Sequence, residues 1–239
     1  MDIKRVVFDE MISRYKVMQI FEKNNIERTA QLMKNCFKNG GVVQLCGTGH
    51  AEEFVNELNF RAGGLAPMHA LNVNDLFIRN LITEEEKADF YNHKENIKRF
   101  EEYYELTNQD MYIIVSPSAN EPLYLEIAKK AKEKGQSVVL VCNRESIHLE
   151  KNKKSIFDYC DVVFDICAHE KDTLVNVEGE GIGQAWTTVA NVMAQMITGE
   201  VYRLYREQDE ECPILLSANL KGADVHNNSL TSPYGKRVR

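Results

Sequence analysis

Apolar residues near the start of the chain recur at helical spacing. Val7, Met11, Tyr15 and Met18 stand three or four positions apart in a regular series, and a second series continues to Phe37. Gly40 and Gly41 follow directly and are typical of a helix end. The pattern predicts helix over residues 2–38. We treat residues 1–38 as a helical segment that packs on the main domain or on a partner subunit, and residues 39–239 as that domain.

Short apolar runs bounded by glycine or polar residues alternate with helical patterns over the rest of the chain. Such runs are typical of strands that are buried on both faces. The runs predict strands at 42–46, 111–116, 137–142 and 161–165, with 213–216 as a further candidate.

The segments between these strands are of several kinds. Residues 144–158 are helical or irregular, residues 168–183 form a polar segment, and the end of the chain is polar. Helices are predicted from the loop after residue 46 to about residue 62, at 120–134 and at 184–206, with one or two surface helices within 75–110.

Alternation of strands and helices predicts one α/β domain with a largely parallel sheet and helices on both faces. In such sheets a ligand binds beyond the carboxyl ends of the strands, where the crossover direction changes. Functional residues are therefore expected just after residues 46 and 116, and after 142 as a third position.

Composition narrows the class of protein. The 239 residues are 44% hydrophobic and 27% charged, with a formal net charge of −7, which is an ordinary globular balance. A negative charge argues against nucleic acid as a partner, because polyanion binders carry a basic face. The one basic cluster, Lys236, Arg237 and Arg239, is interpreted as a solvated tail.

Cysteine usage and hydropathy indicate a compartment. The six cysteines form no Cys-x-x-Cys pair and several stand in apolar runs, so we expect reduced, buried thiols. The acidic pair Asp9–Glu10 precedes any long apolar region, which argues against a signal peptide. Apolar stretches fall short of the roughly 18 residues that span a bilayer, so no membrane association is expected. The predicted location is the cytoplasm.

Two turns carry residues suited to binding an anion. Gly47-Thr48-Gly49-His50 follows the first predicted strand, and Ser116-Pro117-Ser118-Ala119-Asn120 follows the second, each opening a helix. Glycine permits close approach of the backbone, and a helix start offers free N–H groups and partial positive charge. Taken singly, the first is also explained as a tight turn and the second as ordinary helix capping. Two such turns in one sheet favour a shared ligand the size of phosphate.

Other chemically useful residues are scattered along the chain. Glu57 lies two helical turns after His50, so both can face the same side. Glu180 and Thr187 belong to a glycine-broken segment before the long helix, and His226 lies in the polar tail. Histidines with the spacing of metal ligands are absent from the sequence, so we expect no required metal and no cofactor.

Three blocks in chain order resemble the sugar isomerase (SIS) domain family. They are GTGH at 47–50, FRAGGLAP at 60–67 and SANLKGADVHN at 217–227, and the second is the most specific. The match is similar to an uncharacterised bacterial branch of the family. This resemblance implies a flavodoxin-like, three-layer αβα fold that binds phosphosugars as a homodimer or homotetramer. It also implies that the phosphosugar is held by Gly47, Thr48, Gly49, His50, Ser116, Ser118, Asn120 and Thr187.

The resemblance further implies an aldose–ketose isomerase that moves a proton through an enediol. Glu57 falls where phosphoheptose isomerases place a carboxylate, and Glu180 and His226 match positions that could assist as acid or base. Two residues depart from the family pattern: Ala119 replaces a glycine, and Trp186 stands where a small hydroxyl residue is expected.

Two other functions remain open at this point. The same fold serves as a non-catalytic phosphosugar sensor in regulators, which would bind without turnover. A lyase similar to the muramic acid 6-phosphate etherases would release lactate. The sequence leaves the identity of the sugar and the choice between dimer and tetramer undecided.

Overall fold

A five-stranded parallel sheet forms the centre of the molecule. The computed structural model describes residues 2–147, 154–168 and 172–238. The strand order is β2-β1-β3-β4-β5, and all four pairings are parallel. The strands are β1 (Val43–Gly47), β2 (Met68–Leu71), β3 (Met111–Val115), β4 (Val138–Cys142) and β5 (Val162–Asp165).

The direction of the crossovers changes beside β1. From β1 the chain adds β2 on one side, and β3, β4 and β5 then follow on the other. Gly47 is paired with Val115, so the residues that follow β1 and β3 leave the sheet side by side. This is the switch point at which parallel sheets bind ligands, and it coincides with the two turns expected from the sequence.

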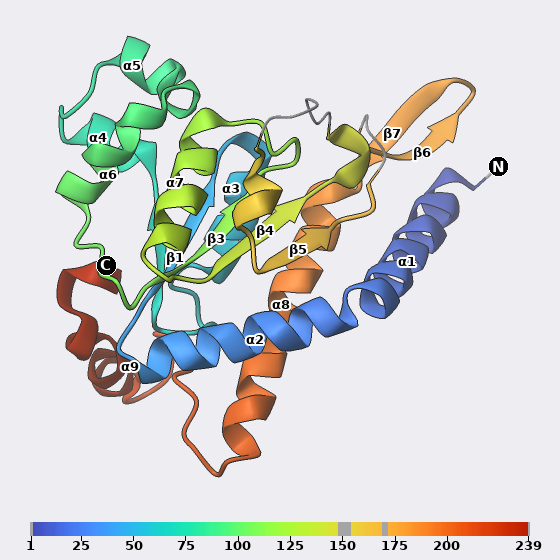
Figure 1. Cartoon of the computed structure of the whole chain (residues 1–239). Coiled ribbons are helices and arrows are strands. Elements are labelled where there is room, and N and C mark those ends of the chain that lie inside the picture. The colour runs from blue at the N-terminus through green and yellow to red at the C-terminus, as the bar shows by residue number, and fades with distance from the viewer. Residues whose placement is uncertain (1, 148–153, 169–171, 239) are drawn as a thin grey trace.

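Helices cover both faces of the sheet and complete three layers (Figure 1). One core cluster joins the sheet to four helices, and the other joins it to helices of the middle of the chain. The first group is α1 (Ile3–Phe21), α2 (Lys23–Lys38), α3 (Glu52–Leu58) and α8 (Trp186–Arg206), and the second is α4 (Val73–Ile78), α6 (Ile97–Tyr103) and α7 (Pro122–Glu133). The three-layer αβα sandwich and its flavodoxin-like strand order are confirmed.

The predicted N-terminal helix is divided in two. α1 ends at Phe21 and α2 begins at Lys23, with Glu22 buried between them. The Glu22 carboxylate accepts hydrogen bonds from Asn25 Nδ2 at 2.6 Å and from the backbone N of Asp165 at 3.2 Å. Burial raises the pKa of Glu22, and these two bonds oppose that shift. The break therefore ties the helical pair to the carboxyl end of β5.

The charged segment 75–110 forms several short helices rather than one or two. Besides α4 and α6 it contains α5 (Glu84–Ala88), and single 3-10 turns lie at Phe90–Asn92 and Lys94–Asn96. Thr83 and Glu86 form a reciprocal capping box at the start of α5. Such local caps let short, charged helices form on the surface.

A second, two-stranded sheet occupies the segment interpreted as polar. β6 (Thr173–Val177) and β7 (Glu180–Gln184) form an antiparallel hairpin that projects from the body beside α1 (Figure 1). Glu178 and Gly179 join them, with φ of 53° and 93°. Positive φ at both central residues is the geometry that matches the twist of a hairpin.

Two strand expectations need correction. β2 lacks the β-branched residues that mark a strand, and its sequence pattern did not predict it. Residues 213–216 join no sheet, and their one bridge is between Ile214 and Leu65. Residues 213–216 instead lie against the residues that lead into β2.

The polar end of the chain is folded, which corrects the interpretation of a solvated tail. It forms α9 (Ala223–Thr231) and a 3-10 segment, η6 (Ser232–Val238). The guanidinium of Arg237 donates to the buried Asp110 carboxylate and to Gly40 O at 3.1 Å. Lys236 is exposed as expected, and Arg239 lies outside the described residues.

All six cysteines are free thiols, as expected, and four of them are buried. Cys160 and Cys167 are half-buried. Within residues 144–158, the described parts contain 3-10 turns at Arg144–Ser146 and Ile156–Tyr159. Among the described helices, none combines the length and the apolar character that crossing a bilayer requires.

Candidate functional site

The loop after β1 depends on glycine for its shape. A Cβ on Gly47 would lie 2.8 Å from Val55 Cγ2 and 2.9 Å from Ala51 O, so only glycine lets α3 pack this closely. Thr48 is extended, and Gly49 has a φ of +59°. The chain then enters a 3-10 turn at Gly49–Ala51 and continues into α3. His50 is exposed at the start of this helical stretch.

The turn after β3 is held by the buried Ser116. Its backbone N donates to Val141 O at 3.0 Å, and its Oγ accepts from the backbone N of Ala119 at 2.8 Å. The same hydroxyl donates to the Glu121 carboxylate. Ser116 is thus engaged within the turn, and of its polar neighbours Ser118 is half-buried and Asn120 is exposed.

Ala119 adopts the backbone conformation expected of the glycine that it replaces. Its φ is +54°, in the left-handed region that disfavours side chains. The N–H of Ala119 points to Ser116 Oγ, so this conformation is coupled to the serine turn. The turn therefore keeps its shape without the glycine.

The carboxyl end of β4 adds two residues that the sequence analysis did not name. The backbone N of Asn143 donates to Pro117 O at 3.0 Å, which places this strand end against the serine turn. Arg144 follows, with a side chain that is 61% exposed and a guanidinium 4.0 Å from Asp165. The sequence did indicate this region, because residue 142 was predicted to end a strand and functional residues were expected after it. Glu121, the partner of Ser116, was also missed.

Glu57 lies at the contact between α3 and α8. Its Oε1 accepts from Gln195 Nε2 at 2.6 Å, and its Oε2 accepts from Arg61 Nη1 at 2.5 Å. The side chain is 22% exposed. The carboxylate is thus oriented by one donor from α8 and one from the loop after α3, while part of it stays open to solvent.

Three other predicted residues lie on separate elements. Thr187 is half-buried in the first turn of α8, and Glu180 is exposed at the tip of the projecting hairpin. His226 lies on α9, with its Nε2 2.9 Å from Ile214 O. Because Ile214 bridges to the chain just before β2, His226 lies toward the beginnings of the strands. One chain therefore brings together the turns at 47–50 and 116–120, but not Glu180 or His226.

Trp186 is a core residue. It is 2% exposed in the larger cluster, and its backbone N donates to Asp172 at 2.7 Å. Its indole therefore anchors the start of α8. Among the described residues, no group of three His, Cys, Asp or Glu side chains has the arrangement of a metal site.

Comparison with known proteins identifies the family. The family model described as the SIS domain matches residues 8–143. The chain belongs to the SIS domain family. A UPF0309 protein of Caldanaerobacter subterraneus is 30% identical over 241 residues, with 97% of each chain covered. A UPF0309 protein of Geobacillus thermodenitrificans is 25% identical, covering 97% of this chain and 94% of the relative.

Solved structures of SIS proteins share the fold. The phosphoheptose isomerase of Neisseria gonorrhoeae superposes with a TM-score of 0.54 at 17% identity, covering 84% of this chain and 97% of that one. The NanR protein of Vibrio vulnificus, complexed with ManNAc-6P, gives a TM-score of 0.50 at 14% identity, covering 87% of this chain and 65% of that one. At these identities the likeness establishes the fold alone.

Proposed function

We propose that this SIS domain protein binds a phosphorylated sugar at the carboxyl ends of β1 and β3 and interconverts its aldose and ketose forms. The observation that carries the proposal is the pairing of Gly47 with Val115, since the two turns that we propose bind the anion follow these paired residues at the switch point. The isomerases and the ManNAc-6P complex among the structures of this fold support the ligand class.

The phosphate would lie against the polar groups of the two turns. Gly47, Thr48, Gly49 and His50 would offer backbone N–H groups and side-chain donors on one side, with Ser118 and Asn120 on the other. Ser116 would act through the turn that it holds. Neither turn contains a lysine or arginine, and Arg144 is the cation at the adjoining strand end. We assign the neutralisation of the phosphate to Arg144, assisted by the N-terminus of α7.

The proton transfer is assigned to Glu57. In the proposed step its carboxylate takes the proton from C2 of the aldose, the electrons of that C–H bond form the C1–C2 double bond, and the carbonyl π electrons move to O1. O1 gains the proton that O2 gives up as the C2 carbonyl forms, and return of the proton from Glu57 to C1 gives the ketose. Arg61 and Gln195 orient the carboxylate, as general base catalysis requires.

Glu180, Thr187 and His226 are proposed to complete the site in an assembly. The hairpin tip and α9 lie apart from the two turns of their own chain, so Glu180 and His226 would serve a neighbouring copy. The apolar side chains of α1 support such a contact, because Phe8 is 65% exposed and Ile20 and Phe21 are each 72% exposed. We therefore propose a homodimer or homotetramer in which residues 1–38 contact the partner subunit. The free thiols support a reducing location such as the cytoplasm.

Proton NMR in deuterated water tests this function. The purified protein is incubated with hexose, hexosamine, heptose and muramic acid phosphates, and loss of the C2 proton signal of one sugar is expected. Glu57→Gln should abolish that exchange while the sugar still binds. Arg144→Gln should instead weaken binding. Unchanged exchange in Glu57→Gln would refute the role of Glu57, and release of lactate would identify a lyase.

A phosphosugar sensor is the second candidate, favoured by the likeness to NanR and by the distance of Glu180 and His226 from the turns. A sensor would show a higher melting temperature with one of the sugars and no proton exchange with any of them.

A further inference from the structure

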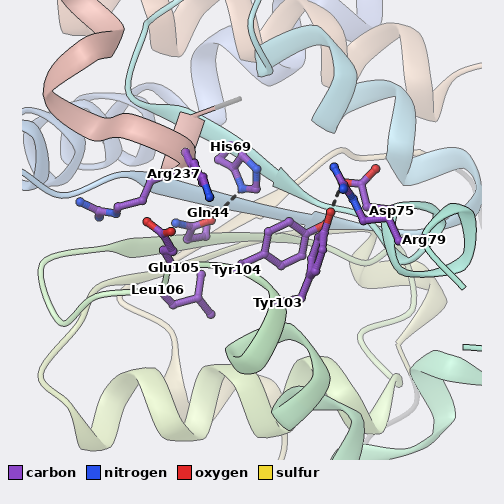
Figure 2. A pocket seen from close by; sticks show the side chains of 10 residues that line it. Gln44, His69, Asp75, Arg79, Tyr103, Tyr104, Glu105, Leu106 and Arg237 are labelled. Atoms are coloured by element: carbon purple, nitrogen blue, oxygen red, sulfur yellow. Dashed lines mark hydrogen bonds between the residues drawn. The ribbon is translucent and has the colours of Figure 1, made fainter. Parts of the chain in front are cut away.

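A cavity lies near the beginnings of β1 and β2, at the other end of these strands from the turn at 47–50. Its volume is about 710 Å³, within the range of small-molecule sites. Figure 2 shows Gln44, His69 and Tyr104 at its centre, with Arg79 and Asp75 toward one side and Arg237 and Glu105 toward the other. Tyr103, Leu106 and Lys236 complete the lining, which includes no residue of the two turns at 47–50 and 116–120.

The floor of the cavity is a buried polar chain where a parallel sheet normally buries apolar residues. Gln44 is 1% exposed and His69 is 6% exposed, and they are paired on adjacent strands. Gln44 Nε2 donates to Asp110 at 3.0 Å, so Gln44 Oε1 faces His69 Nδ1 at 3.3 Å. A carbonyl oxygen only accepts, and His69 is therefore protonated on Nδ1. Burying such a polar network costs free energy, and here the network borders a cavity rather than a packed core.

Tyrosines form the aromatic wall of this cavity. The Tyr104 ring meets His69 edge-on at 5.0 Å, and Tyr103 packs against Tyr104 at 4.7 Å. The Tyr104 hydroxyl donates to Asp75 at 2.9 Å, which fixes the ring. An aromatic face beside fixed amide and imidazole groups suits a ring that carries hydroxyl groups.

Positive charge gathers at the mouth although the whole chain is acidic. Arg237 is neutralised by Asp110, whereas Arg79 lies 5.6 Å from the Tyr103 ring centroid and Lys236 is exposed on η6. Two carboxylates, Asp75 and Glu105, balance these two cations, and Asp75 keeps its charge while it accepts from Tyr104. Arg79 and Lys236 are both exposed, so their charged groups are accessible to an anion such as phosphate.

A neighbouring cavity of about 670 Å³ shares His69 and Asp75 with this one. Four of its other lining residues, Asn56, Asn59, Asn72 and Asn228, are amides, which bind sugar hydroxyls as both donors and acceptors. The polar surface around β2 thus extends past a single phosphate-sized position.

We propose that the cavity formed by Gln44, His69, Tyr103, Tyr104, Arg79 and Lys236 is a second binding site for a phosphorylated sugar. The ring would lie on the tyrosines, its hydroxyls against Gln44 and His69, and its phosphate at Arg79 and Lys236. This site is independent of the proposed function, because it shares no residue with the carboxyl-edge turns.

Histidine NMR on the full-length protein tests the second site. The imidazole signals of ¹³C-histidine-labelled protein are recorded during titration with fructose 6-phosphate, N-acetylmannosamine 6-phosphate, unphosphorylated fructose and inorganic phosphate. The His69 signals are assigned by their Overhauser contacts to the Tyr104 ring. We expect one of the sugar phosphates to shift His69, with fructose and inorganic phosphate each binding at least about tenfold more weakly.

Variants separate the two sites. Arg79→Gln with Lys236→Gln, both surface changes, should weaken the His69 response about tenfold. Arg28→Gln removes an exposed arginine of α2 and serves as the matched control, and Ser118→Ala affects only the carboxyl-edge site. If neither sugar phosphate shifts the His69 signals, the second site is overturned. It is also overturned if the His69 shift persists unchanged in the Arg79/Lys236 variant. A shift of His50 alone would overturn it while supporting the proposed function.

Discussion

Asp110 is the polar group on which the start of the sheet most depends. It is 1% exposed and accepts from Val42 N, Gln44 Nε2, Thr107 N and Thr107 Oγ1, each at 3.0 Å. It also accepts from the Arg237 guanidinium. The carboxylate thus joins β1, the loop before β3 and the C-terminal segment.

The stability lost in Asp110→Ala depends on the hydrogen-bond donors that the substitution leaves without an acceptor. Val42 N, Thr107 N and Gln44 Nε2 would lose their acceptor inside the protein, at about 1–1.5 kcal/mol each. The variant is therefore expected to lose about 3–5 kcal/mol of stability. Arg237→Met should cost only about 1–2 kcal/mol, because Asp110 keeps its other donors. The stability lost in the double variant should be about 1 kcal/mol smaller than the sum of the two single losses.

Urea unfolding measures these values, with the fluorescence of Trp186 as the signal. Trp186 is the one tryptophan of the chain and is 2% exposed, so its emission reports loss of the main core. Equal slopes of free energy against urea in all variants establish that the same transition is compared. The reasoning would be refuted if Arg237→Met cost as much as Asp110→Ala, since the bond to Arg237 would then outweigh the other donors.

Three further predictions concern Glu22, the thiols and Ala119. Burial raises the pKa of Glu22 above its ordinary value of 4.5, so ionisation of Glu22 destabilises the fold. Relative to Glu22→Gln, the wild type should gain stability as the pH falls through the raised folded-state pKa toward 4.5, and should gain no more below 4.5. Urea unfolding of both proteins measures this difference. A difference in stability that stays constant over the range would contradict the burial effect. Burial raises the pKa of Cys167 to about 11 and that of Cys36, Cys142, Cys160 and Cys212 to about 12, so iodoacetamide at pH 8 should modify the native protein slowly and Cys167 first. Peptide mass spectrometry checks this order, with urea-unfolded protein as the control, and rapid labelling of buried Cys36 would count against it. Ala119→Gly should stabilise the fold by up to about 1 kcal/mol, because relief of the positive φ exceeds the added freedom of the unfolded chain. Thermal unfolding against an Ala88→Gly control, at a helical position, should show opposite signs, and a destabilised Ala119→Gly would disprove the strain.

The sequence by itself determined the fold class and the place of the two turns to which we assign phosphosugar binding. Strands at 42–46, 111–116 and 137–142 were predictable because each is mostly apolar and buried on both faces. The strand at 161–165 was predictable from its short Val-Val-Phe run, and it is buried on one face and half-buried on the other. The turns at 47–50 and 116–120 followed from the same strands, since residues that end adjacent parallel strands meet at one edge. These features are local in the chain, and short-range patterns report them.

Tertiary structure alone decided which distant residues meet. Gln44, His69 and Asp110 look like isolated polar residues in the sequence, and strand pairing makes them one network. Arg237 belonged to an apparent tail, and its contact with Asp110 spans 127 positions along the chain. Strand β2 has no strand-like composition and forms because β1 offers it a free edge. Periodicity measures which face of an element is apolar, whereas contacts between elements depend on how the whole chain packs, and that information is absent from any short window of the sequence.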